Sequence, residues 1–325
     1  MRLGYGIVKL IEVKMSDSQV KFNYIITIHN KEKLIKDVLL SVMNSARAES
    51  WIYPVLDGCT DGSEAIIDEI ISSYPDVNIK KLYAPDVHEL KSINIGLRGA
   101  NQDGEIYNII LQDDVLLQDT DLEKKCVALY RSINNLGIVS FRHGGNISRG
   151  LIQKTAITDP LSDYIENECG HNPHAVSVLR NGFFVFREIA IKSPICIPSK
   201  VIREIGIPDE NYAPWDDIAY CYKVSQAGYS NGVFALDFRS DVDWGTTREK
   251  IQVVKIDKVQ QKNLNLFRRQ NPTLSNLDSH KYGTRKVQIF ESNRQYPFNF
   301  STFLKGLYHK VAYPIKHQLK VLLHK

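Results

Sequence analysis

Short apolar runs alternate with amphipathic segments through the first third of the chain. Four of these runs have the length and the β-branched and aromatic content of buried strands, at residues 22–28, 52–56, 78–83 and 105–111. The segments between them repeat apolar side chains at helical spacing, which predicts helices over residues 32–45, from 61 through 71, and over 88–100. Strands that alternate with helices in this way predict βαβ units and a mostly parallel sheet.

The pattern is less regular in the second half. It predicts a helix over residues 119–136 and strands over 137–141, 181–186 and 230–238. A further helix should begin near Pro214 and end before Gly228, and residues 257–269 should form a closing helix. Residues 142–178 are rich in Gly, Asn, His and Pro, and we expect them to form a long irregular segment of the kind that usually carries function.

Polar side chains follow three of the predicted strands where each strand ends. His29 follows the first strand, Asp57 ends the second, and Asp113 and Asp114 follow the fourth. Because right-handed connections bring the carboxyl ends of parallel strands to one edge, we expect His29, Asp57 and Asp114 to lie close together. For an isolated pair of aspartates, a solvated turn is an equally good interpretation.

A second acidic pair, Asp216 and Asp217, should lie in the first turn of the helix that begins near Pro214. There the helix macrodipole favours negative charge, so a structural role is the alternative to a functional one. The predicted helix from residue 61 has a similar signal, because Asp61 and Glu64 have the spacing of a capping box.

A cleft edged by these aspartates would be acidic, so an anionic ligand would need a divalent cation to enter it. Magnesium is commonly held by one or two carboxylates together with substrate phosphates. The chain has neither the P-loop pattern nor the dinucleotide-binding glycine pattern, which argues against a P-loop NTPase and an ordinary dehydrogenase. The chemistry therefore predicts a metal-bridged phosphate compound as ligand, and no nucleic acid.

Charge is unevenly distributed along the 325 residues. Residues 273–325 hold nine basic and two acidic side chains, a net +7, which leaves −3 for the rest of a chain whose total is +4. This tail is either a solvated appendage or a surface helix that contacts anionic lipid, and we favour the second. Pro314 interrupts it, so it is not one long amphipathic rod.

The five cysteines are scattered, which predicts free thiols in a reducing compartment. No apolar run reaches 18 residues, and residues 1–14 lack the core and cleavage site of a signal peptide. We therefore expect a cytoplasmic protein, peripheral on the cytoplasmic face of the membrane.

Five segments in order resemble motifs of the family 2 glycosyltransferases. Residues 24–30 resemble their first strand, 55–63 their "VDDGSTDGS" signature, and 94–106 their "N-x-G-x-x-x-A-x-G-E-x-I" segment. Residues 112–114 stand at their DxD metal motif, and 205–217 match "iGgfDE…ED". The resemblance spans about residues 22–267, and the shared order and spacing make it specific.

The resemblance implies a GT-A fold, an α/β architecture with a mixed, mostly parallel sheet flanked by helices. It implies a Rossmann-like nucleotide-sugar half over residues 21–118 and an acceptor half over 119–270 of the same domain. Residues 1–20 would then be a leader, and 271–325 a basic helical extension.

The resemblance also implies a reaction and roles for residues. The expected activity is inverting transfer of a sugar from a nucleotide-sugar donor to a hydroxyl of a saccharide or lipid-linked saccharide, in cell-surface polysaccharide or glycan synthesis. Asp114 would bind Mn²⁺ or Mg²⁺, and Asp217 would be the general base, supported by Asp216 and Trp215. The residues expected to bind the nucleotide are Thr27, His29, Asp57, Asn94 and Asp113.

Several positions depart from the family pattern. Leu56 and Gln112 each stand where an acid is usual, and Asp243 is the candidate for a further metal ligand that many relatives supply as histidine. One alternative is therefore a catalytically degenerate carbohydrate- or nucleotide-binding relative. Another is a nucleotidyltransferase, although residues 29–32 are not the phosphate loop that such an enzyme needs. Residues 169–174 contain a cysteine and two histidines, and we interpret them as an acceptor loop rather than a zinc site.

Overall fold

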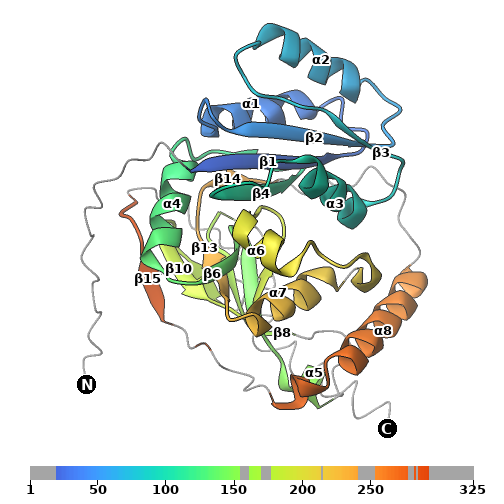
Figure 1. The fold of residues 1–325 in the computed structure, drawn as a ribbon, viewed down its shortest axis with the longest axis vertical. Coiled ribbons are helices and arrows are strands. Elements are labelled where there is room, and N and C mark those ends of the chain that lie inside the picture. The colour runs from blue at the N-terminus through green and yellow to red at the C-terminus, as the bar shows by residue number, and fades with distance from the viewer. Residues whose placement is uncertain are drawn as a thin grey trace, which may run out of the picture.

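The computed structural model shows a mixed sheet flanked by helices (Figure 1). Nine strands form it, in the order β15-β10-β13-β6-β12-β4-β1-β2-β3. The structure describes residues 20–153, 161–169, 177–213, 215–240, 253–276, 282 and 285–292. The α/β class expected from the sequence is confirmed.

The four strands predicted in the first third form the parallel part of the sheet. They are β1 (Lys21–Ile28), β2 (Trp51–Asp57), β3 (Leu82–Ala84) and β4 (Ile106–Gln112). β3 is shorter than predicted, because only an isolated bridge between Ile52 and Ile79 precedes it. β1 and β4 are buried along almost their whole length, which explains why both are continuous apolar runs in the sequence.

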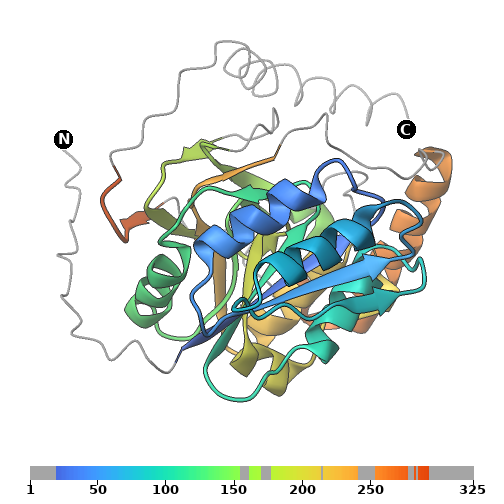
Figure 2. The same ribbon diagram turned by 90° about the horizontal axis from the view of Figure 1, so that it is seen from above.

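Helices cover both faces of these strands. α1 (Ile35–Ser45) and α2 (Ser63–Ser73) lie on one face and α3 (Glu89–Gly99) on the other (Figures 1 and 2). Side chains of β1 alternate between the two cores: Tyr24 and Ile26 pack with α1, whereas Ile25 packs with α3. The three predicted helices are thus confirmed.

The second half of the sheet is mixed. β12 (Ile195–Pro198), which the sequence did not reveal, lies antiparallel between β4 and β6 (Leu136–Ser140). β13 (Ser230–Phe234) is parallel to β6, and β10 (Phe183–Phe186) is antiparallel to β13. β15 (Lys286–Gln288) closes this edge, so part of the predicted extension is a strand of the sheet. The two halves predicted to meet near residue 118 share this one sheet.

The prediction that residues 142–178 are irregular was wrong for much of this segment. β7 (His143–Ile147), β8 (Leu161–Asn167) and β9 (Ser177–Leu179) form a second sheet with β11 (Ile189–Ile191), and α5 (Arg149–Ile152) follows β7. Its glycine-rich composition has a packing reason. A Cβ atom on Gly144 would lie 2.4 Å from the carbonyl oxygen of Ile189, so the close approach of β7 and β11 requires glycine.

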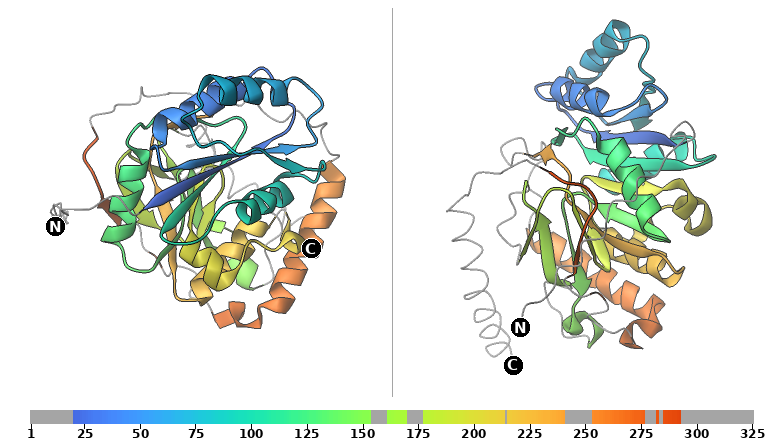
Figure 3. Two further views of the ribbon diagram at one scale, coloured as in Figure 1. Left: turned by 45° about the horizontal axis from the view of Figure 1, so that its top comes forward. Right: turned by 90° about the vertical axis from the view of Figure 1, so that its left-hand side faces the viewer.

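The remaining elements complete the framework of the site. The helices are α4 (Leu122–Ser132), α6 (Ser199–Ile205), α7 (Asp216–Gln226) and α8 (Val253–Gln270), with 3₁₀ turns η2 (Glu210–Tyr212) and η4 (Pro272–Asn276) and a small sheet of β5 (Leu116–Leu117) and β14 (Phe238–Arg239). α8 lies along the side of the molecule (Figure 3), and Phe267 packs edge-on against Tyr222 of α7. None of the helices in the described ranges is long and apolar enough to cross a membrane.

Three local predictions need correction or qualification. α4 is shorter than residues 119–136, because β6 already begins at Leu136. The capping box at α2 does not form: Asp61 accepts from the Ser63 backbone, but Glu64 binds Lys81 instead of reaching back. The predicted strand 230–238 is two strands, β13 and β14. Pro214 lies outside the described residues.

Candidate functional site

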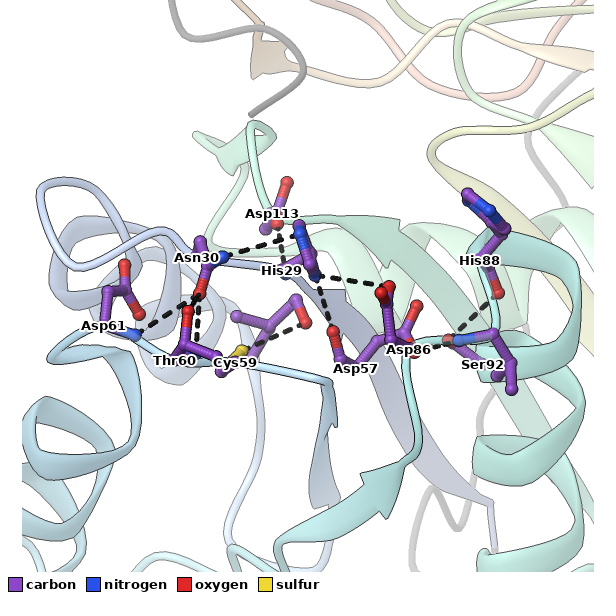
Figure 4. A network of polar contacts seen from close by, with 12 residues as sticks. His29, Asn30, Asp57, Cys59, Thr60, Asp61, Asp86, His88, Ser92 and Asp113 are labelled. Carbon is purple, nitrogen blue, oxygen red and sulfur yellow. Dashed lines mark hydrogen bonds and ion pairs between the residues drawn. The ribbon is translucent and has the colours of Figure 1, made fainter. Parts of the chain in front are cut away.

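His29 lies at the centre of a polar cluster where β1, β2 and β4 end (Figure 4). Its backbone N–H donates to Asp113 Oδ2 at 2.9 Å, and its ring Nδ1 lies 2.6 Å from the backbone oxygen of Asp57. A carbonyl oxygen can only accept, so Nδ1 carries the proton. Asp86 approaches the same ring nitrogen at 3.9 Å. We call His29, Asp57, Asp86 and Asp113 the His29 cluster.

Asp57 is almost fully buried. Its Oδ1 accepts from the backbone N–H of Val87 at 2.7 Å, which fixes the segment after β3 against the end of β2. The neighbouring loop is held by Asn30, whose side-chain oxygen accepts from the backbone N–H of Thr60 at 2.8 Å. Thr27 is buried beside the cluster, paired in register with Gln112 of β4.

The two aspartates after β4 have different surroundings. Asp113 accepts from His29 and lies 3.7 Å from the Lys31 ammonium, although burial still raises the pKa of its carboxyl to about 6. Burial also raises the pKa of Asp114, against the opposing charges of Arg142 and Lys31. Asp114 Oδ1 is buried and has no hydrogen-bond donor within the described part of the chain.

This acceptor oxygen is suited to a hard cation, whose usual ligands are carboxylate oxygens. Within the same described ranges, no three His, Cys, Asp or Glu side chains gather as a metal-binding group. Asp114 is thus the member of the pair that could ligate a metal.

A second charged group lies at the start of α7. Asp216 and Asp217 occupy its first turn, as predicted, and Asp216 is buried in an ion pair with Lys192. Asp217 keeps some exposed surface, but burial of its carboxyl raises its pKa to about 8, with Asp216 and Glu89 adding to this and Lys192 opposing it. We call Lys192, Glu89, Asp216 and Asp217 the Lys192 cluster.

Gln112 connects the two clusters. It directly precedes Asp113, and its side-chain amide donates to Glu89 Oε1 at 2.7 Å. Its backbone N–H donates to Ser193 Oγ at 2.9 Å, next to Lys192. A small cavity of about 20 Å³, enough for about one water molecule, is lined by Lys192, Asp216 and Asp217 among apolar side chains.

Sequence reasoning missed Glu89 and Lys192. Neither belongs to a motif, and their partners lie far away in the sequence. The only local sign was that Glu89 follows the predicted start of a helix, where an acidic residue is ordinary.

Other predicted residues make separate contacts. The Asn94 side chain is buried and donates to the Pro208 backbone oxygen at 2.9 Å and to Glu210 at 3.1 Å, which joins α3 to the segment before α7. Trp215 is the N-cap residue of α7, and its backbone oxygen accepts from the backbone N–H of Ala219. Asp243 lies outside the described residues.

Of the residues 169–174 only Cys169 is described. It is buried with its sulfur 3.4 Å from the backbone oxygen of Leu236, and burial raises the pKa of the thiol to about 12. It is therefore a protonated core thiol at neutral pH.

Two solved structures have some likeness to this one. A mannosyltransferase of Pyrobaculum calidifontis, PcManGT, solved with GDP-Man and Mn²⁺, is 16% identical with a TM-score of 0.45, over 67% of this chain and 55% of that one. The chain thus spans little more than half the length of that protein. S. aureus TarS 1-349 in complex with UDP-GlcNAc is 13% identical with a TM-score of 0.44, over 78% of this chain and 75% of that one.

The comparison with curated proteins gave no match to this sequence. The comparison with family models did give one. The model described as glycosyl transferase family 2 matches residues 24–191, which is more than half of the chain and includes the His29 cluster and Glu89. The resemblance inferred from the motifs is thereby confirmed: the chain belongs to glycosyl transferase family 2.

Proposed function

We propose that this protein is a metal-dependent inverting glycosyltransferase that moves a sugar from a nucleotide-sugar donor to a hydroxyl of a saccharide or lipid-linked saccharide. The observation that carries the proposal is the link made by Gln112. Gln112 directly precedes Asp113 and Asp114, which would bind a metal-bridged nucleoside diphosphate. Its side-chain amide donates to Glu89, which belongs to the same cluster as Asp217, the proposed base.

The His29 cluster is the donor side of the proposed site. Thr27, His29, Asp57 and Asp113 would contact the nucleotide, and Asn94 would support them by fixing α3. Asp114 would hold Mn²⁺ or Mg²⁺ through its buried oxygen. When bound, the metal supplies charge that neutralises the departing diphosphate.

Asp217 is the proposed general base. The acceptor oxygen forms a bond to the anomeric carbon while the bond from that carbon to the diphosphate breaks and its electron pair leaves with the diphosphate. The Asp217 carboxylate takes the proton of the acceptor hydroxyl, and this single displacement inverts the anomeric carbon. Asp216 and Trp215 position Asp217, the first by holding Lys192 and the second by starting α7.

The proposed site assigns different functions to different parts of the chain. We assign donor binding to residues 21–118 and acceptor binding and catalysis to 119–270. The basic residues of 271–325 would hold the protein against an anionic membrane surface on the cytoplasmic side, close to a lipid-linked acceptor.

A binding protein without activity is the second candidate. It is favoured by Gln112, which stands where relatives have an acid and whose amide is already committed to Glu89. The family match favours glycosyl transfer over nucleotidyl transfer.

A thermal-shift screen of nucleotide sugars with and without Mn²⁺ should identify a donor that stabilises the protein only with metal. With that donor, Asp217→Asn should bind as the wild type does and transfer no sugar, because only the base is lost. Metal-dependent binding without transfer by the wild type would support the binding protein instead, and transfer by Asp217→Asn at the wild-type rate would refute the proposed base.

A further inference from the structure

The Lys192 cluster concentrates three carboxylates around one ammonium group. The Lys192 side chain, 14% exposed, pairs with Asp216, 6% exposed. Glu89 reaches the group from α3, and Asp216 and Asp217 reach it from α7. The other titratable side chains that line this cavity are Tyr220, whose hydroxyl donates to the Gly206 backbone oxygen, and Cys221, whose pKa is raised by burial.

This ammonium group has a fixed position. Asp216 binds it directly, and the next residue, Ser193, accepts from the backbone of Gln112. Burial alone would lower the pKa of Lys192, but Asp217, Glu89 and Asp216 together raise it above its ordinary value. Lys192 is therefore charged at neutral pH.

We propose that Lys192 is a positioning residue for the transfer reaction, whose ammonium group, held by Asp216, favours the ionised form of the neighbouring Asp217 carboxylate. The inference rests on the proposed function, in which Asp217 accepts the proton of the acceptor hydroxyl. The two aspartates of α7 then have separate roles: Asp216 holds the Lys192 ammonium group, and Asp217 accepts the proton.

The charge balance explains why a cation is needed here. Two adjacent carboxylates and Glu89 disfavour ionisation of one another, and burial disfavours it further. The ammonium group is the charge that opposes these effects at Asp217. Without it, the pKa of Asp217 would rise above about 8, and at neutral pH less of the protein would hold an ionised base.

The test compares the pH dependence of kcat/KM in variants. Lys192→Met should move the acidic limb of the profile upward by about one pH unit or more, which lowers activity at pH 7 about tenfold while the loss shrinks at high pH. Lys192→Arg keeps the positive charge, so the acidic limb of its pH profile should lie near the wild-type position.

Lys125→Met is the matched control. Lys125 also pairs with a buried carboxylate, Asp119, with both oxygens at 2.7 Å, but in α4 and outside the site. Its loss should lower the melting temperature without moving the pH profile. A limb that stays in place in Lys192→Met, or that moves equally in Lys125→Met, would overturn the proposal.

The same titration can be followed without turnover. ¹³C labelling of the aspartate carboxyls reports the Asp217 pKa by NMR, with Asp217→Asn to assign the signal. An Asp217 pKa that is the same in wild type and Lys192→Met refutes the inference even if no donor is found. Should Lys192→Met not fold, Lys192→Gln takes its place, and an Asp217 pKa equal to that of the wild type would refute the inference. Inactivity of the wild type with a shifted Asp217 pKa would refute the proposed function alone.

Discussion

The transfer activity of the wild-type protein should rise steeply as pH increases from 7 to 9. A general base acts only in its ionised form, and the Asp217 carboxyl has a pKa of about 8, far above the ordinary value for aspartate. The cause is burial together with the charges of Asp216 and Glu89, which the ammonium group of Lys192 offsets only in part.

The size of the effect follows from this pKa. At pH 7 about one tenth of the protein holds an ionised Asp217, at pH 8 about one half, and at pH 9 about nine tenths. kcat/KM should therefore increase about fivefold from pH 7 to pH 8 and less than about twofold from pH 8 to pH 9. An aspartate with an ordinary pKa would be ionised throughout this range, and the profile would be flat.

The measurement is the release of nucleoside diphosphate from the donor selected by thermal shift, followed from pH 6 to pH 10 with Mg²⁺ and acceptor. kcat/KM is the relevant parameter, because it reports the groups of the enzyme before the acceptor binds. Donor binding measured by calorimetry over the same range serves as the control for Asp113, whose pKa is raised to about 6. Activity that does not change between pH 7 and pH 9 would refute the assignment of Asp217 as a buried base.

Two further substitutions test the donor side and the framework. Asp114→Asn should weaken the metal-dependent binding of the nucleotide sugar about tenfold or more, because it removes the negative charge of a carboxylate whose buried Oδ1 has no hydrogen-bond partner in the described part of the chain. If the wild type and Asp114→Asn each bind the nucleotide sugar equally well with and without Mn²⁺, this prediction is contradicted. Glu123→Ala should lower the free energy of unfolding by about 3 kcal/mol in denaturant titrations. The buried Glu123 carboxylate accepts from Tyr24, Ser50 and Arg47, which would lose their partner. Glu69→Ala, which breaks an exposed pair, should cost less than about 1 kcal/mol, and equal losses would contradict the role of burial.

Residues whose role depends on nearby sequence were the ones that the sequence could predict. β1, β2 and β4 are continuous apolar runs, and the side chains that follow such a strand must lie at its carboxyl end. A meeting of polar side chains at this edge therefore followed from topology, although Asp113, and not the expected Asp114, contacts His29. β7 escaped prediction because Gly144 is there for close packing against a neighbouring strand, whereas glycine in a sequence indicates a turn. Composition cannot distinguish these two uses.

The sequence did not indicate which polar and charged side chains from distant parts of the chain contact each other. Lys192 meets Asp216 after 24 residues, and Gln112 meets Glu89 across 23, with nothing local to mark either pair. Such contacts arise only when the sheet brings α3, β4 and α7 together. The sequence could therefore predict which acids belong to the site, but not which cation balances them.

Gln112 shows how this changes the interpretation of a motif. In the sequence, Gln112 stands where the metal motif usually has an acidic residue. In the structure its amide donates to Glu89, so a carboxylate is present at this place, contributed by α3 instead of β4. An aspartate at position 112 would face Glu89 as a like charge, within reach of the carboxylates of α7, and would raise their pKa values further. The glutamine therefore relieves repulsion in a cluster with three carboxylates and one ammonium group, and its presence is compatible with an active enzyme.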